Sequence, residues 1–152
     1  MHRLHLAVTA VIVAASLATA ATGAIAATRA AGGTTTVATA GSHLGRILVD
    51  GQGRTLYLFE KDAKGRSSCA GACAAYWPPL LTLGKPAARG SVKQPLLGVT
   101  RRGDGTSQVT YAGHPLYRFV QDTKPGQANG QGLDVYGAEW YVLSPAGTKV
   151  ER

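Results

Sequence analysis

The sequence is poor in the residue types that most often carry chemistry. It has two cysteines, four histidines, one methionine and only eight acidic residues, against sixteen lysines and arginines. Outside the first five residues the only histidines are His43 and His114. No Ser-His-Asp set, glycine-rich phosphate loop or zinc-ligand spacing is present. We therefore predict a protein that is not an enzyme and that needs no cofactor and no metal.

The N-terminus lacks acidic residues and has the pattern of an export signal. Arg3 is followed by an uncharged stretch from Leu6 to Ala27 that is rich in alanine and valine. Small residues at the end of this stretch predict a signal peptide over residues 1–26, with cleavage after Ala20 as the alternative. Few bulky apolar residues are present, which disfavours a permanent membrane anchor. No cysteine lies near either site to carry a lipid, so we expect a secreted or cell-envelope protein that is released.

Residues 27–43 contain alanine, threonine and glycine with a single charge, Arg29, and few bulky side chains. This composition predicts a flexible leader. The remaining residues, 44–150, suffice for one domain.

The folded part is basic. Removal of residues 1–26 deletes only Arg3 from the charged side chains, which changes the net charge from +8 to +7. An exported basic domain is attracted to an anionic cell-wall polymer or a membrane surface, and these are the partners that we expect. The basic residues are scattered, apart from the adjacent Arg101 and Arg102, and no nucleic-acid-binding motif is present. We therefore expect no nucleic-acid partner.

The most informative pattern is an internal repeat with an offset of sixty residues. The segment Tyr57-Leu58-Phe59-Glu60-Lys61-Asp62 returns as Tyr117-Arg118-Phe119-Val120-Gln121-Asp122. Trp77 has a looser counterpart in Trp140. Two copies of one supersecondary unit are therefore predicted, repeat one at about 44–83 and repeat two at about 96–147. Four further residues recur at the same offset: Val49, Gly53, Leu56 and Lys64 as Val109, Gly113, Leu116 and Lys124.

Glycine-rich turns separate short segments rich in β-branched and aromatic residues, and no segment keeps a 3.6-residue period. The one helical candidate is Cys69–Tyr76, which ends before Pro78 and Pro79. We predict an all-β fold: a small antiparallel sandwich or partly closed barrel, with one short helical turn. Three hairpins are expected, formed by residues 46–50 with 55–60, 97–101 with 108–111, and 133–136 with 140–143.

The repeated motif predicts a shared core. Alternate residues of a strand point to the same side, so Tyr57 and Phe59 share one face, and Tyr117 and Phe119 share another. We expect these four rings to pack between the two units. Asp62 and Asp122 each begin a turn and are expected to accept backbone N–H groups there. The alternative is a hydrolase in which these two carboxyl groups act as a pair.

The combined motifs resemble a bacterial secreted-repeat family whose members are often described as predicted lipoproteins with a Tyr-x-aromatic-x-x-Asp motif. The similarity covers nearly all of residues 44–147. It implies an exported envelope protein of unknown biochemical activity and assigns no catalytic residue. The chain departs from many relatives in having no cysteine for a lipid anchor. The matching segments are Gly53–Asp62, Ser68–Ala74, Trp77–Leu80, Gly113–Tyr117, Gly130–Gly132 and Trp140–Tyr141.

The only two cysteines, Cys69 and Cys73, lie four positions apart. On one helical turn their Cα atoms would be about 6 Å apart, a distance that a disulfide tolerates. Because exported proteins meet oxidising conditions, we favour a disulfide. The alternative is a metal- or redox-linked protein in which the two thiolates hold a soft metal such as Cu(I).

Several aromatic residues outside the repeated motif are candidates for stacking on a ligand such as a sugar ring. The alternative for the two tryptophans is a place in the core of a small β domain. On balance we predict a non-enzymatic binding or structural module. The candidate stacking residues are Tyr76, Trp77, Tyr136, Trp140 and Tyr141.

Overall fold

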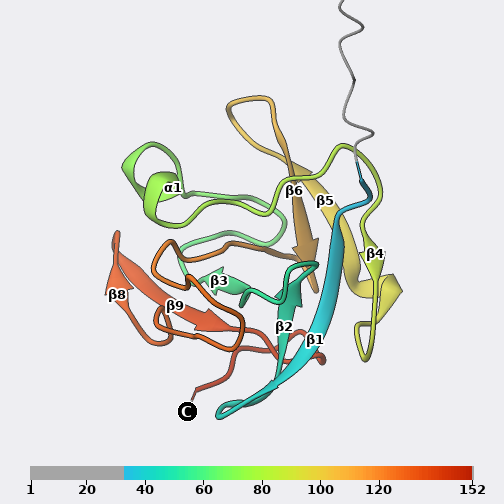
Figure 1. The fold of residues 1–152 in the computed structure, drawn as a ribbon. Helices are drawn as coiled ribbons and strands as arrows, with labels where there is room; N and C mark the ends of the chain where they lie inside the picture. The colour runs from blue at the N-terminus through green and yellow to red at the C-terminus, as the bar shows by residue number, and fades with distance from the viewer. Residues whose placement is uncertain (1–32, 152) are drawn as a thin grey trace, which may run out of the picture.

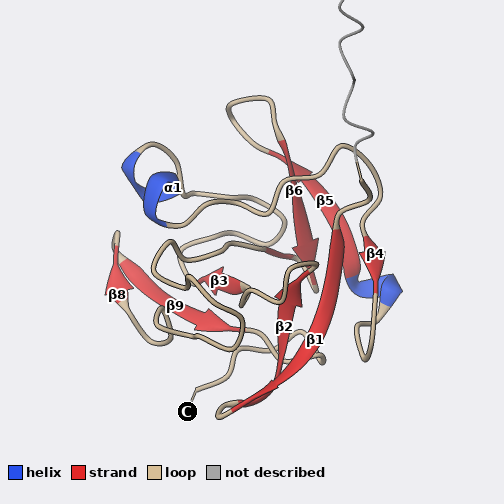
Figure 2. Cartoon of the chain, in the orientation of Figure 1, coloured by secondary structure: helices blue, strands red, loops and turns tan. Residues whose placement is uncertain are grey.

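The structure is a computed structural model that describes residues 33–151 (Figure 1). The predicted signal peptide and the first residues of the predicted leader lie outside the described residues. Strands dominate the chain, with one short α-helix and one 3-10 turn (Figure 2). The elements are β1 (Thr36–Ser42), β2 (Gly45–Asp50), β3 (Tyr57–Phe59), α1 (Ala72–Tyr76), β4 (Ala87–Ala88), the 3-10 turn (Gln94–Leu96), β5 (Leu97–Arg101), β6 (Ser107–Tyr111), β7 (His114–Pro115), β8 (Asp134–Val135) and β9 (Ala138–Val142).

The strands form three small sheets with the orders β2-β1-β4, β3-β9-β8 and β5-β6-β7. All pairings within them are antiparallel except that of β1 with β4, where Thr36 and Val37 pair in parallel with Ala87 and Ala88. Isolated bridges, such as that between Tyr57 of β3 and Tyr117, connect strands to segments outside them. The all-β fold class is therefore confirmed, and the described residues form no closed barrel.

The prediction of a flexible leader over residues 27–43 is wrong for its second half. Residues 36–42 form β1, which pairs along its length with β2, and Val37 is completely buried. Small side chains do not prevent a strand when a neighbouring strand supplies the hydrogen bonds. The repeat contained the missing signal, because the predicted strand at 97–101 shifted back by sixty residues falls on residues 37–41.

The hairpins differ in detail from the prediction. The β5–β6 hairpin has the expected register, with Val99 opposite Val109. The β8–β9 hairpin turns at Tyr136-Gly137, whereas the expected turn covered residues 137–139. In the first predicted hairpin only the Val49–Thr55 bridge forms, and β3 then leaves β2 to pair with β9.

The path of β3 follows from its two apolar faces. Tyr57 and Phe59 lie in one buried cluster, and Leu56 and Leu58 lie in another on the opposite side. A strand with both faces apolar must lie between two layers, so it cannot remain in an outer hairpin. The central position of β3 is visible in Figure 1.

The two repeats meet at a reciprocal contact between equivalent residues. The Tyr57 backbone N–H donates to the Tyr117 carbonyl at 2.9 Å, and the Tyr117 N–H donates to the Tyr57 carbonyl at 3.0 Å. Such an exchange places an approximate two-fold axis between the tyrosines. The duplicated sequence is therefore folded as a symmetric pair of interlocked units.

Candidate functional site

The tyrosine of each repeated motif donates a hydrogen bond to the aspartate of the other repeat. The Tyr57 hydroxyl lies 2.5 Å from Asp122 Oδ2, and the Tyr117 hydroxyl lies 2.7 Å from Asp62 Oδ2. Both hydroxyls donate to a charged acceptor, which makes these bonds stronger than neutral ones. The motif therefore joins the two repeats.

The two aspartates also accept backbone groups of their own turns. Asp62 Oδ1 accepts the Ser68 N–H at 2.7 Å, and Asp122 Oδ1 accepts the Asn129 N–H at 2.9 Å. Among the described contacts, no hydrogen bond or shared partner joins Asp62 to Asp122. Paired catalysis needs both carboxyl groups to face one scissile bond. A hydrolytic role for these residues stays a prediction that these contacts do not favour.

Burial governs the acid–base behaviour of the four residues. It raises the pKa of Asp62 and of Asp122, while hydrogen bonds from the tyrosines and the turns partly oppose the shift. Burial also raises the pKa of the Tyr57 and Tyr117 hydroxyls. The phenols therefore stay protonated and remain donors at neutral pH.

Four rings of the core form a continuous stack that follows the symmetry of the repeat. Phe59 stacks on Trp140 at 4.0 Å, Trp140 on Trp77 at 3.9 Å, and Trp77 on Phe119 at 4.3 Å between ring centroids. Both tryptophans are completely buried. Of the candidate stacking residues, Trp77 and Trp140 thus lie in the core.

The disulfide between Cys69 and Cys73 is present and closes the loop that leads into α1. Both cysteines are buried, and neither is a free thiolate in the structure. The alternative site of two metal-binding thiolates is therefore not formed. A helix of five residues has little stability of its own, so the covalent link helps to hold α1 in place.

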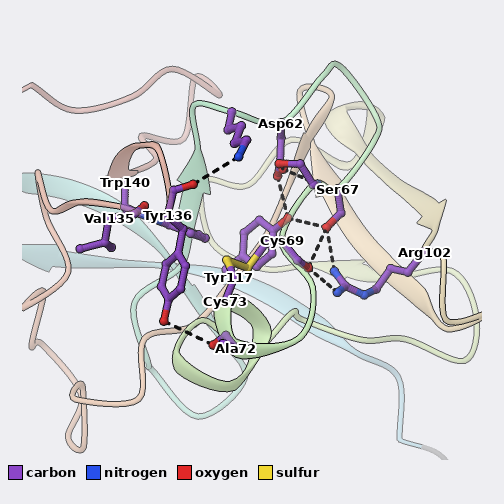
Figure 3. Close-up of a disulfide and its surroundings, with 12 residues drawn as sticks. Asp62, Ser67, Cys69, Ala72, Cys73, Arg102, Tyr117, Val135, Tyr136 and Trp140 are labelled. Carbon is purple, nitrogen blue, oxygen red and sulfur yellow. Dashed lines mark hydrogen bonds between the residues drawn. A yellow bond between two sulfur atoms is a disulfide. The ribbon is translucent and has the colours of Figure 1, made fainter.

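The disulfide loop is tied to the second repeat by Arg102 (Figure 3). The buried guanidinium donates to the Cys69 carbonyl at 2.7 Å, to Ser67 Oγ at 2.8 Å and to Gln108 Oε1 at 2.7 Å. The Tyr117 hydroxyl and Ser67 Oγ are also hydrogen bonded, at 2.7 Å, which connects this network to the motif. In the sequence Arg102 was one of two adjacent basic residues, and only the fold distinguishes it from its exposed neighbour Arg101.

Beside the disulfide loop lies an open groove lined by aromatic side chains. Its volume is about 600 Å³. Tyr76 from the end of α1 and Tyr136 from the β8–β9 turn remain 53% and 39% exposed, with ring centroids 6.4 Å apart. The buried rings of Trp77 and Phe119 form the floor. Leu133, Val135 and the exposed amide of Gln121 complete the lining. We call this set of residues the aromatic groove.

The backbone at Tyr136 is unusual. Its φ angle is +64°, and that of Gly137 is +93°, so the β8–β9 turn places a tyrosine where glycine, asparagine or aspartate is normally found. A left-handed conformation costs roughly 1–2 kcal/mol for a residue with a side chain. Figure 3 shows the Tyr136 ring directed towards Ala72, whose carbonyl accepts the tyrosine hydroxyl at 3.4 Å. The strained backbone thus aims this ring at α1, beside Tyr76.

Tyr141, the last candidate stacking residue, lies outside the aromatic groove. Its hydroxyl donates to Glu139 Oε2 at 2.8 Å, and Lys149 Nζ lies 4.7 Å from its ring centroid. Salt bridges join Lys149 to Glu60 and Glu151. Tyr141 is therefore part of a charged surface cluster.

The structural roles of Gly130 and Arg102 were not predicted from the sequence. Gly130 packs so closely on Trp77 that a Cβ there would lie 2.5 Å from the ring. The backbone N–H of Gly130 donates to the Tyr57 hydroxyl at 3.2 Å. The only sequence signal was its place in the resemblance to secreted repeats.

Among residues 33–151, no cluster of three or more His, Cys, Asp or Glu side chains could hold a metal ion. In the same residues no helix is both long and apolar enough to cross a membrane.

Comparison with known proteins gives one match. The sequence profile of a family described as a secreted repeat of unknown function matches residues 38–81 and 98–144, which together exceed half of the chain. The two matched segments start at equivalent places, within β1 and β5. No curated protein and no solved structure matches the chain.

Proposed function

This chain belongs to a family of secreted repeats, and on that premise we propose that it is an exported binding module of the cell envelope rather than an enzyme. The observation that carries the binding role is the aromatic groove. Exposed aromatic rings with hydrophobic walls and a polar group at the rim are typical of ligand sites. The strain at Tyr136 supports the same conclusion, because unfavourable backbone conformations concentrate at functional positions.

The groove suits a polymer of sugar rings. The flat face of a sugar presents C–H groups that pack on an aromatic ring, and the two tyrosine hydroxyls and the Gln121 amide can hydrogen-bond to sugar hydroxyls. Among the residues that line the groove there is no lysine, arginine, aspartate or glutamate. We therefore propose that the groove itself takes a neutral segment of an envelope glycan, while the positive charge of the whole domain draws it towards anionic envelope polymers.

A pulldown on purified cell wall tests this proposal. The mature chain, residues 27–152, would be mixed with wall material at low and at physiological salt, and the bound fraction measured. We expect binding that persists at physiological salt, because stacking is not screened by ions. The variant Tyr76→Ala with Tyr136→Asn should lose this binding by about tenfold or more. Asparagine is chosen at position 136 because it tolerates the left-handed backbone.

Tyr141→Ala is the matched control, because it removes an aromatic side chain outside the groove. It should bind the wall like the unmodified chain. Far-ultraviolet circular dichroism and a thermal melt would establish that all variants are folded. Equal recovery with and without wall material, or equal binding by the groove variant and the control, would rule out the proposed site.

A further inference from the structure

A second candidate surface lies at the loop before β4, on the side of the molecule away from β8 (Figure 1). Leu83 is 96% exposed and Leu81 is 44% exposed, the first being the most exposed large hydrophobic residue in the described part of the chain. Figure 1 shows this loop beside the beginning of β1, away from β8. Isolated exposed leucines are common on protein surfaces, so a binding role for Leu83 must be argued from the residues around it.

The loop presents Leu83 on an ordered turn. The Thr82 hydroxyl donates to the Gly84 carbonyl at 2.7 Å and accepts the Gly84 N–H at 3.3 Å. The Thr82 N–H donates to the Ser107 carbonyl of β6 at 2.9 Å, and Leu81 forms a bridge with Gln108. The Leu83 side chain is therefore held outward at the tip of an ordered turn. This arrangement allows the side chain to insert into an apolar environment outside the protein.

Basic residues surround this tip. Lys85 lines the same hollow as Leu83, and Arg89, which is exposed directly after β4, lines a neighbouring hollow with Leu81. Gly105 of the β5–β6 loop lines a hollow of about 430 Å³ with Leu83, and the Arg101 guanidinium lies beside this glycine. Lys85 and Arg89 therefore share hollows with the exposed leucines, and Arg101 lies beside the facing β5–β6 loop.

One acidic residue, Asp104, belongs to the β5–β6 loop, and its charge is partly compensated. Its carboxylate accepts the backbone N–H and the hydroxyl of Thr106 and lies 3.7 Å from Arg102 Nε. The overall balance at this surface remains positive, as it is for the whole chain.

We propose that Leu81, Leu83, Lys85, Arg89 and Arg101 form a docking surface for an anionic phospholipid bilayer. Leu83 inserts at the boundary of headgroups and acyl chains, and the three cations bind lipid phosphates. The contact is reversible, because one inserted side chain and a few charges bind weakly. It leaves the aromatic groove, which none of these residues lines, free for a ligand.

Vesicle sedimentation of the mature chain, residues 27–152, tests this proposal. Vesicles of phosphatidylglycerol and phosphatidylcholine in equal parts would be compared with vesicles of phosphatidylcholine alone. We expect binding to the first and little to the second. Leu83→Ala should weaken binding by roughly tenfold at any salt concentration. Lys85→Gln and Arg89→Gln should each weaken it by about fivefold, mainly at low salt.

Two controls separate insertion from general charge. Val120→Ala changes a side chain that is 42% exposed, on a residue whose backbone N–H donates to the Tyr76 carbonyl, and Lys124→Gln removes an exposed charge elsewhere. Both should bind vesicles like the unmodified chain. Equal loss with Lys124→Gln and Lys85→Gln would mean that net charge alone is responsible and would overturn the proposal. Unchanged binding of Leu83→Ala would overturn it too, as would binding to purified anionic wall polymer but not to vesicles.

Discussion

At the scale of single residues, the repeated motif links two chemically matched pairs. Asp122 is almost completely buried, and a buried carboxylate is tolerated only when donors surround it. Tyr57 supplies one such donor to Asp122 from the opposite repeat, and Tyr117 does the same for Asp62. The aspartates are therefore best understood as acceptors for these tyrosines as well as for their own turns.

Removal of the Tyr57 hydroxyl should be costly. Tyr57→Phe removes the tyrosine donor to Asp122 and should lower the free energy of unfolding by about 1–3 kcal/mol. Urea denaturation measures this change. Tyr141→Phe is the control, because the Tyr141 hydroxyl donates to Glu139 in a partly exposed cluster. This variant should lower the free energy of unfolding by less than about 1 kcal/mol. Equal losses for the two variants would contradict the structural role of the buried pair.

Titration of Asp122 should also affect the pH dependence of the free energy of unfolding. Burial raises its pKa above the ordinary value of 3.8, so the folded state binds the proton more tightly than the unfolded state does. Its stabilising contribution is complete below pH 3.8 and is lost as the pH rises through the folded-state pKa. Compared with Asp122→Asn, the unmodified chain should therefore lose stability as the pH rises from below 3.8 towards neutrality. Thermal melts of both proteins across this range provide the test; a relative gain in stability with rising pH would show that the pKa is lowered instead.

At the scale of elements, the four-ring stack is the main packing unit. Phe59 and Phe119 form its two ends, and each stacks on the tryptophan of the other repeat. Phe59 stacks on Trp140, and Phe119 stacks on Trp77. Phe59→Ala or Phe119→Ala should each cost about 3–5 kcal/mol, whereas Asp62→Asn should cost about 1 kcal/mol. Thermal melts of the three variants give the order. Wild-type melting of both phenylalanine variants would mean that the stack contributes little.

The disulfide acts on one element, α1 and the loop before it. Closing so short a loop restricts the unfolded chain only modestly, so Cys69→Ser with Cys73→Ser should cost about 2 kcal/mol. Melts with and without reductant should show the same loss in the unmodified chain. An intact mass two hydrogens below that of the reduced chain, with no thiol labelling, would verify the bond. A variant as stable as the unmodified chain would mean that Arg102 alone holds the loop.

At the scale of the whole molecule, the two repeats depend on each other. Sheet β3-β9-β8 takes strands from both, and so do the tyrosine–aspartate pairs and the ring stack. A single repeat would expose these faces, and a small domain cannot compensate for that loss. We expect residues 33–95 and residues 96–152 each to be unfolded alone and to form a folded complex when mixed. Circular dichroism of each fragment and of the mixture measures this; a cooperative melt from either fragment alone would contradict it.

Much of this organisation was predictable because it is written in local patterns. The repeat is found by direct comparison of two segments, whereas the shared face of Tyr57 and Phe59 and the spacing of the cysteine pair depend on residues close in sequence. The β1 strand was missed although the same offset contained it, since small residues carry a weak signal by themselves. Two of the predicted stacking residues, Tyr76 and Tyr136, line the aromatic groove, whereas Tyr141 lies outside it. No local pattern in the sequence distinguishes Tyr141 from the other two.

The amino-acid sequence indicated two similar β units with a shared core, and it favoured export and a disulfide between Cys69 and Cys73. These expectations follow from comparison of the two segments, from composition and from residue spacing, none of which requires knowledge of the packing. Only the tertiary structure decided that each tyrosine bonds the aspartate of the other repeat, that Arg102 is buried while Arg101 is exposed, and that two tyrosines share a groove. The physical reason is that pairing across an approximate two-fold axis depends on how two whole units pack, and no local segment carries that information.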